Sequence, residues 1–206
     1  GNASYSVNNG NGTFTESGEQ TFNHFTMNSM GNDIADYNND GQPDIITVDM
    51  LSRDEKRLKK EAVDEEPFIY DYKYADNGYH FQYVKNCLQT NNGDDSSFSE
   101  TSLISGVSAT AWSWAPLFAD FDNDGNKDLI VTSGIEKNFI DMDFLKFAKE
   151  QVKKEMTPAQ SAVNLQAISN MSSGSSYPFL FKGDGQLTFT DVSDSWGTKK
   201  LKGCTN

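Results

Sequence analysis

Two nine-residue segments of this chain place oxygen-bearing side chains at the same alternating positions. One runs from Asp36 to Asp44 and the other from Asp120 to Asp128, and both have Asp or Asn at positions one, three, five and nine. A Ca²⁺ ion needs roughly six to eight oxygen ligands, and a short segment supplies several when alternate side chains point inward. These spacings predict two Ca²⁺ sites. The predicted ligands are Asp36, Asn38, Asp40, Gln42 and Asp44 in the first loop, and Asp120, Asp122, Asp124, Asn126 and Asp128 in the second.

Position six of each loop is a glycine, Gly41 or Gly125, where the backbone has to turn sharply. The residue after it, Gln42 or Asn126, is expected to offer its main-chain carbonyl oxygen. Surface turns rich in Asp and Asn, without metal, are the alternative interpretation. The repetition of one ligand order in two places argues against that alternative.

The residues after the loops distinguish these sites from an EF-hand. An EF-hand needs a bidentate Glu at position twelve and a helix after the loop, and a bacterial dockerin loop also continues into a helix. Position twelve is Thr47 in the first segment and Val131 in the second, and both lie in runs rich in β-branched residues. Both loops are therefore predicted to lead into β-strands.

Three glycine-containing turns, each before an aromatic residue in an alternating run, predict β-hairpins. They occur at residues 9–16, 92–100 and 182–191, and the first two are each followed by one of the acidic loops. The chain is therefore predicted to hold two repeat units and part of another, with mainly β structure.

Two insertions interrupt this repeat. Residues near 52–62 begin with a capping-box pattern and predict a short exposed helix. Apolar residues at helical spacing predict a longer helix from about 138 to 156, and Pro158 starts another helix within the insertion 138–170. These helices are expected to pack on their own scaffold, with the binding of a partner as the alternative.

Aromatic residues recur with period two in three further segments. Phe68 to Tyr74 and Tyr79 to Tyr83 are predicted to be strands. Trp112 is followed two residues later by another tryptophan, and this pair is expected to pack in the core between adjacent sheets. A ligand-stacking platform is the alternative for the tryptophans.

Composition excludes several functions. The chain has 30 acidic and 17 basic residues and a formal net charge of −13, which argues against nucleic acid and anionic membrane surfaces as partners. No apolar run is long enough to predict membrane insertion. Cys87 and Cys204 could form a disulfide, or Cys87 could be a buried apolar residue. His24 and His80 have no accompanying nucleophile and orienting group, so no catalytic residue is predicted.

Four features together resemble the FG-GAP/VCBS repeats of integrin-α-like β-propellers. They are the hairpins, the Gly-Val pair at 106–107, the tryptophan-rich segment before the second loop, and the acidic loop itself. Residues 83–147 are more narrowly similar to large secreted Bacteroidetes VCBS proteins, often found beside an ASPIC/UnbV domain. The resemblance implies antiparallel four-stranded propeller-type blades, two plus a partial third, each with calcium held at a loop between strands. Loop positions one, three, five and nine carry over as ligands. Asn38 is a mild departure, and its lower charge predicts a weaker first site.

A seven-bladed propeller needs on the order of 300 residues, so residues 1–206 are expected to be a single repeat region from a fragment or an incomplete propeller. Open strand edges would favour self-association. The expected function is a structural calcium-binding module of a secreted or cell-surface protein, extracellular or periplasmic, engaged in adhesion or in binding a glycan or protein. The alternatives are part of a calcium-dependent polysaccharide lyase or other glycan-active enzyme, and an architectural spacer.

Overall fold

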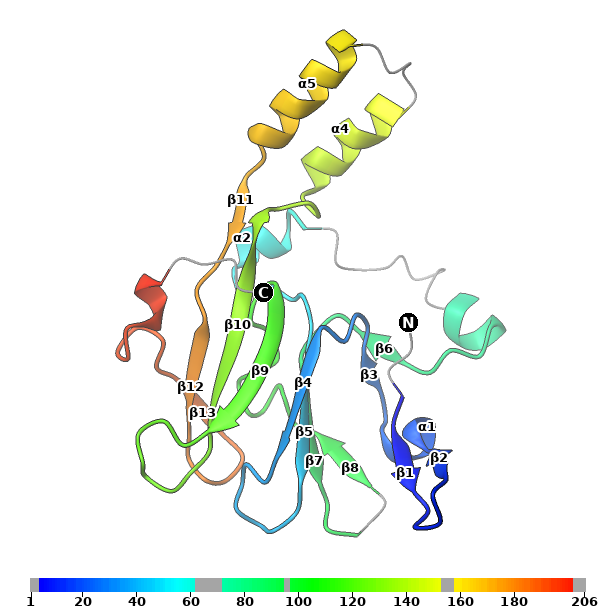
Figure 1. Ribbon diagram of the computed structural model, residues 1–206, viewed down its shortest axis with the longest axis vertical. Helices are drawn as coiled ribbons and strands as arrows, with labels where there is room; N and C mark the ends of the chain where they lie inside the picture. The colour runs from blue at the N-terminus through cyan, green and yellow to red at the C-terminus, as the bar shows by residue number, and fades with distance from the viewer. Residues whose placement is uncertain (1–3, 62–71, 95–96, 153–157, 202–206) are drawn as a thin grey trace.

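The computed structural model describes residues 4–61, 72–94, 97–152 and 158–201. Short strands form two main sheets that stand side by side, and the two longest helices lie beyond one end of them (Figure 1). The fold is mainly β with antiparallel sheets, which confirms the predicted fold class. The strands are β1 (Ser6–Asn8), β2 (Phe14–Glu16), β3 (Phe25–Thr26), β4 (Gly31–Ala35), β5 (Asp44–Val48), β6 (Gln82–Tyr83), β7 (Cys87–Asn91), β8 (Phe98–Glu100), β9 (Ser113–Ala119), β10 (Asp128–Lys137), β11 (Ser173–Ser175), β12 (Phe179–Gly183) and β13 (Phe189–Asp191). The α-helices are α1 (Gly18–Thr21), α2 (Glu55–Leu58), α4 (Met142–Val152) and α5 (Pro158–Ser169).

The two main sheets repeat one topology. The first has the strand order β4-β5-β7-β8, and the second has β9-β10-β12-β13, with β11 paired to the far end of β10. Each acidic loop joins the first two strands of its sheet. Ala35 lies opposite Asp44 across the first loop, and Ala119 lies opposite Asp128 across the second. The sheet register therefore closes both loops at the same position.

The order of parts within a repeat differs from the sequence prediction. Hairpins β7-β8 and β12-β13 complete the sheets that begin with the acidic loops, because β7 pairs with β5 and β12 pairs with β10. The partial third repeat is therefore the N-terminal hairpin β1-β2. In that hairpin Phe14 is 65% exposed, whereas the equivalent Phe98 and Phe189 are 9% exposed. The expectation of a buried face holds for the second and third hairpins only.

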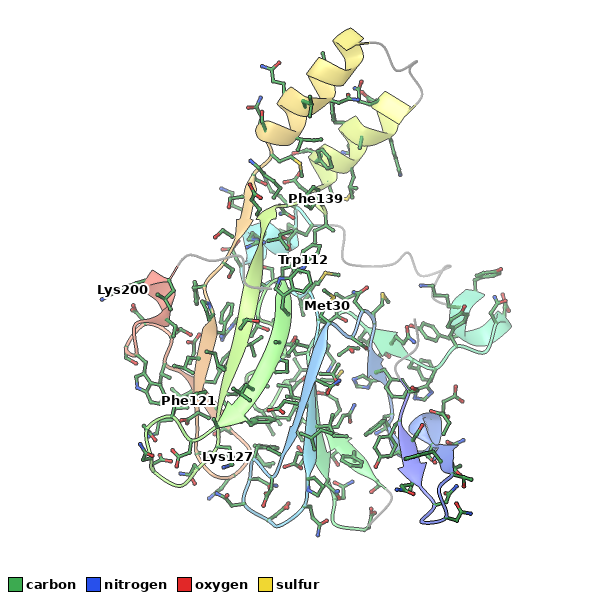
Figure 2. The ribbon with its side chains drawn as sticks, viewed as in Figure 1. Met30, Trp112, Phe121, Lys127, Phe139 and Lys200 are labelled. Carbon is green, nitrogen blue, oxygen red and sulfur yellow. The ribbon has the colours of Figure 1, made fainter. Side chains whose placement is uncertain are left out.

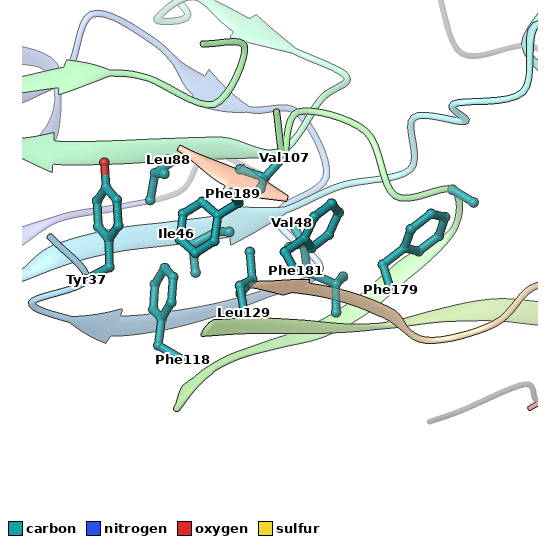
Figure 3. Packing of buried hydrophobic residues seen from close by; sticks show 12 residues of the cluster. Tyr37, Ile46, Val48, Leu88, Val107, Phe118, Leu129, Phe179, Phe181 and Phe189 are labelled. Atoms are coloured by element: carbon teal, nitrogen blue, oxygen red, sulfur yellow. The ribbon is translucent and has the colours of Figure 1, made fainter. Parts of the chain in front are cut away.

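The main core lies between the two sheets (Figure 3). Alternation along β5 turns Ile46 and Val48 toward the second sheet, and both are fully buried. Strands of the second sheet supply the facing aromatic and aliphatic side chains, among them Phe118, Leu129 and Phe181. A smaller cluster built from Phe22, Phe25 and Phe98 covers the other side of the first sheet.

Where the structure describes them, the aromatic runs differ from the predicted strands. Tyr72–Asp76 is a π-helical turn, and residues 68–71 of the first run lie outside the described residues. Only Gln82 and Tyr83 of the second run form a strand, which pairs in parallel with β3. The Tyr74 hydroxyl bonds both the carbonyl and the N–H of Gln82 at 3.0 Å, so the segment folds back on itself.

The tryptophans do not enter the core between the sheets. Trp112 and Trp114 are partly buried, their rings lie 6.5 Å apart, and Trp114 Nε1 donates to the carbonyl of Gly134 at 2.7 Å. A register shift places Trp114 and Ala115 opposite the single residue Thr132. This bulge changes the side-chain alternation that the prediction assumed.

Helices α2 and α4 begin at different residues from those predicted, whereas the predicted start of α5 is confirmed. Asp54 caps α2 by accepting the N–H of Arg57 at 2.7 Å, in place of the predicted cap at Ser52. β10 continues to Lys137, and α4 starts only after Asp141, whose Oδ1 accepts the N–H of Asp143 at 2.9 Å. Helix α5 begins at Pro158. Helices α4 and α5 form a hairpin that projects away from the sheets (Figure 1).

The two insertions meet. The N–H of Met142 donates to the carbonyl of Lys60 at 2.8 Å, and Asn138 Nδ2 donates to Glu61 Oε1 at 3.0 Å. Glu61 and Asn138 are both buried at this junction. A region formed jointly by segments far apart in sequence therefore lies at the helical end of the molecule.

Cys87 is a buried free thiol, and burial raises its pKa to about 12. Cys204 lies outside the described residues, so the disulfide stays a prediction. Within the described part of the chain, no helix has the length and apolar character needed to cross a membrane.

Candidate metal centre

The first residue of each loop holds the turn together. Asp36 Oδ1 accepts the N–H of Asp40 at 3.0 Å, and its Oδ2 accepts the N–H of Gly41 at 2.9 Å. Asp120 makes the same two bonds in the second loop, at 3.1 and 2.9 Å. Gly41 and Gly125 have φ values of 87° and 89°, in the left-handed region that glycine adopts without strain. The sharp turn predicted at position six is present in both loops.

Positions three and five follow the same plan. Asn38 Oδ1 and Asp122 Oδ1 each accept the N–H two residues ahead, at 3.3 and 3.2 Å. Asp40 Oδ1 accepts the N–H of Gln42 at 2.8 Å, and the second loop repeats this bond between position five and Asn126. Each of these side chains is thus oriented by backbone N–H groups of its own loop. Ligation by the carbonyls of Gln42 and Asn126 stays a prediction.

The structure brings three of the predicted ligands of the second loop together. Ligand atoms of Asp120, Asp122 and Asp124 lie within 4.8 Å of one another. Lys182 Nζ bonds Asp122 Oδ2 and lies 2.8 Å from Asp124 Oδ2. This group of carboxylates therefore already attracts a cation from a neighbouring strand. In the first loop the corresponding place is taken by an amide, because Asn38 Nδ2 donates to Asp40 Oδ2 at 2.8 Å.

The residues at position nine, Asp44 and Asp128, differ from the other predicted ligands in burial and in hydrogen bonding. Asp44 and Asp128 are fully buried, and both oxygens of each accept backbone N–H groups. Asp44 Oδ2 bonds the N–H of Tyr37 in the loop at 3.1 Å, and its Oδ1 bonds the N–H of Asn91 on β7 at 2.9 Å. Among the described residues, the close group of carboxylates does not extend to Asp128. The ninth residues link the loop to the sheet.

The electrostatics separate these positions. The pKa of Asp44 is raised to about 6, because burial disfavours its charge more than the two backbone hydrogen bonds favour it. The pKa of Asp124 is lowered, chiefly by the hydrogen bond from Lys182. The pKa of Lys182 is raised by the same contacts. The lowered pKa keeps Asp124 ionised, as a ligand for a hard cation must be.

The two loops touch each other. Asn39 Nδ2 donates to Asn126 Oδ1 at 3.3 Å. Behind Asn126, the turn of the β12-β13 hairpin passes so close that a Cβ at Gly185 would lie 2.2 Å from Asn126 Oδ1. Phe121 and Lys127, labelled in Figure 2, lie at this loop end, away from Phe139 at the base of the helical hairpin. Both candidate sites therefore lie on one end of the sheets.

The grouped atoms of the second loop are carboxylate oxygens, the type of donor that hard divalent cations prefer. Sequence reasoning missed Lys182, which lies 60 positions after Asp122 and reaches it only through the pairing of β12 with β10. The lysine carries no local signal in the sequence. It could have been found only by placing hairpin 182–191 in the same sheet as the second loop.

Repeated antiparallel sheets with an acidic loop between their first two strands define a β-propeller-like repeat module. The model of the FG-GAP-like repeat family matches residues 1–47 and 75–131, and the chain belongs to this family. The matched segments contain both acidic loops and leave out the stretch that contains α2. No curated protein and no solved structure matches the chain.

Proposed function

We propose that this chain is a calcium-stabilised, non-catalytic repeat module of a secreted or cell-surface protein that takes part in adhesion or in binding a glycan or protein. The observation that carries the proposal is the ligand group Asp120, Asp122 and Asp124, oriented by backbone N–H groups and matched in the first loop by Asp36 and its neighbours. Bound Ca²⁺ would offset the repulsion among these carboxylates. It would stabilise the folded state, because the unfolded chain does not hold the ligands together.

The test is thermal unfolding of the chain in chelator, followed by addition of Ca²⁺ or Mg²⁺. At a Ca²⁺ concentration about a hundred times the dissociation constant, the stabilisation is about 2.7 kcal/mol, which corresponds to about 5 to 10 °C for a domain of this size. Mg²⁺ should give a smaller shift, because it demands octahedral geometry and loses water reluctantly. A melting temperature that chelation and Ca²⁺ leave unchanged would refute the metal proposal. The triple variant D120N/D122N/D124N is the control, because it lacks the three grouped carboxylates of the second site.

An extracellular or periplasmic location belongs to this proposal. Loops with two or three carboxylates at positions one, three and five suit the weak sites of extracellular modules, which fill at roughly 0.1 to 1 mM Ca²⁺. Membership of the FG-GAP-like repeat family, whose repeats are typically extracellular, supports the same location.

The alternative, a calcium-dependent polysaccharide lyase or other glycan-active enzyme, would require a proton-transferring residue. Both histidines serve packing instead. His80 Nε2 donates to the carbonyl of Phe22 at 2.9 Å, and burial followed by the charge of Lys85 lowers the pKa of His24. Incubation with uronic-acid polymers separates the two functions, because only a lyase yields unsaturated product. A purely architectural spacer would bind nothing on a glycan array.

Self-association is also proposed, through open strand edges and one exposed sheet face. Tyr37 and Phe121 occupy the second position of their loops. Tyr37 is 2% exposed because it stacks on Phe118 and Phe189 of the neighbouring sheet, whereas Phe121 is 41% exposed. The aromatic ring that the first loop buries against the next sheet is therefore exposed in the second loop.

A further inference from the structure

A pocket of about 400 Å³ lies at the end of the sheets opposite the acidic loops. It is formed by the segment after β5 together with β13 and the approach to β12. Strand β5 starts at Asp44 beside the first loop and ends at Val48, so the residues that follow it lie at the far end. The pocket is thus separate from the candidate metal sites and joins parts of both repeats.

Arg53 is held in a fixed orientation in this pocket. Its guanidinium carbon lies 6.0 and 5.7 Å from the ring centres of Phe179 and Phe181, and its Nη1 donates to Asp191 Oδ2 at 2.9 Å. The side chain remains 41% exposed. Among the contacts of the described residues, only this one nitrogen is engaged. The rest of the planar donor fork is available to a ligand.

Arg57 is fixed by a different partner. Its Nε donates to Glu61 Oε1 at 3.0 Å, and the buried Glu61 also accepts a hydrogen bond from Asn138. Among the contacts of the described residues, the Arg57 side chain is engaged through Nε alone, so its two terminal nitrogens can meet a ligand. Two preoriented guanidinium groups that line one pocket suit the paired recognition of a planar carboxylate.

The same pocket also offers acceptors. Asp54 and Asp191 line it, together with the hydroxyl groups of Ser176 and Tyr177. A phosphate or sulfate ion carries accepting oxygens on every side, so some of them would face these carboxylates and be repelled, whereas a ligand with its charge at one end can turn that end toward the arginines. A molecule that carries one carboxylate and several hydroxyl donors satisfies both sets of groups. The partly buried ring of Tyr177 adds an apolar surface, with Lys199 Nζ 5.9 Å from the ring centre.

We infer that this pocket binds a uronic-acid residue of an acidic polysaccharide. The sugar carboxylate pairs with Arg53 and Arg57, and sugar hydroxyls donate to Asp54 and Asp191. A volume of about 400 Å³ falls within the ordinary range of small-molecule sites. The inference deepens the proposed binding function by naming its ligand, and it rests on that function. It does not depend on the metal.

The test is isothermal titration of the full chain, in Ca²⁺-containing buffer, with trigalacturonate and with neutral cellotriose. The wild type should bind trigalacturonate at least about tenfold more tightly. R53Q and R57Q should each weaken that binding by about tenfold or more, as expected for a lost charge-assisted hydrogen bond. R53K keeps the charge but loses the fork, and should also weaken binding. K59Q is the matched control, because Lys59 lies beside the same helix, is 78% exposed and does not line the pocket.

Equal affinity for the two sugars, or no binding of trigalacturonate by the wild type, would overturn the inference. Binding that R53Q and R57Q leave unchanged would place the ligand elsewhere and overturn it as well. Tighter binding of a hexaglutamate peptide than of trigalacturonate would make the ligand a protein and reject the saccharide. The wild-type comparison stands even if an arginine variant folds poorly. Failure of the chelation experiment would remove the calcium proposal and leave these measurements unaffected.

Discussion

The side chain of Asp128 joins the second acidic loop to strand β12, because its Oδ1 accepts the N–H of Gly183 at 3.1 Å. Its other oxygen accepts the N–H of Phe121 within the loop at 2.9 Å, and the residue is fully buried. Asp44 makes the corresponding bonds in the first loop. One Asp of each nine-residue pattern thus holds the sheet, while in the second loop those at positions one, three and five converge.

Asp128→Ala should lower the free energy of unfolding by about 3 kcal/mol in chelator, because two buried N–H groups lose their acceptor. Asp122→Ala should cost at most about 1 kcal/mol under the same conditions, since it breaks an exposed ion pair. Urea unfolding in chelator measures both. Equal losses would show that position nine has no special part in holding the sheet.

Lys182→Gln should raise the Ca²⁺ affinity of the second loop by about fivefold. The ammonium group contacts Asp122 and Asp124, and its charge opposes an incoming cation by about 1 kcal/mol at such distances in water. Calorimetric titration with Ca²⁺ measures the change. Lys200→Gln is the control of equal charge, and it should leave the affinity unaltered.

Asn38→Asp should raise the Ca²⁺ affinity of the first loop by about five- to tenfold, because a third carboxylate replaces an amide that now donates to Asp40. Titration of the variant beside the wild type tests this. The double variant with Lys182→Gln should have two tight sites. An unchanged Ca²⁺ affinity of the first loop in the Asn38→Asp variant would exclude Asn38 as a ligand.

Stability should fall in acid partly through Glu100. Burial alone would raise the pKa of Glu100, but hydrogen bonds from Lys85 and Ser102 outweigh burial and bring the pKa below its ordinary value of 4.5. A folded pKa below the unfolded one gives stability that is present above about pH 4.5 and is lost as the pH falls through the folded pKa. Glu100→Gln should therefore flatten the decline in unfolding free energy below about pH 4.5. Glu19→Gln, at an exposed position, should not.

Phe121→Ser should weaken self-association by about tenfold, because burying such a side chain contributes about 1.5 to 3 kcal/mol. Sedimentation velocity over a range of concentrations measures the effect. Phe139→Ser removes a comparably exposed ring, 51% exposed, from the base of the helical hairpin and serves as the control. A wild type that stays monomeric throughout would reject self-association itself.

Local patterns determined much of this protein. The alternating oxygens, the glycines at position six and the β-branched runs after them describe chain geometry over fewer than about fifteen residues, which side-chain spacing and φ preferences control directly. For the same reason the hairpins and the mainly β fold followed from sequence. The strand predicted for the end of the aromatic run at Tyr74 is wrong, because the contact of the Tyr74 hydroxyl with Gln82 outweighs the period-two pattern.

Tertiary structure decided what each acidic residue does. The spacing predicted the same role for Asp128 and Asp122, but pairing of β10 with β12 brings Gly183 to Asp128 and Lys182 to Asp122. The tertiary structure also places Arg53 beside Asp191, 138 positions away. Such contacts depend on which strands become neighbours. Strand pairing depends on burial of the whole core between the sheets, and local residue spacing does not determine that burial.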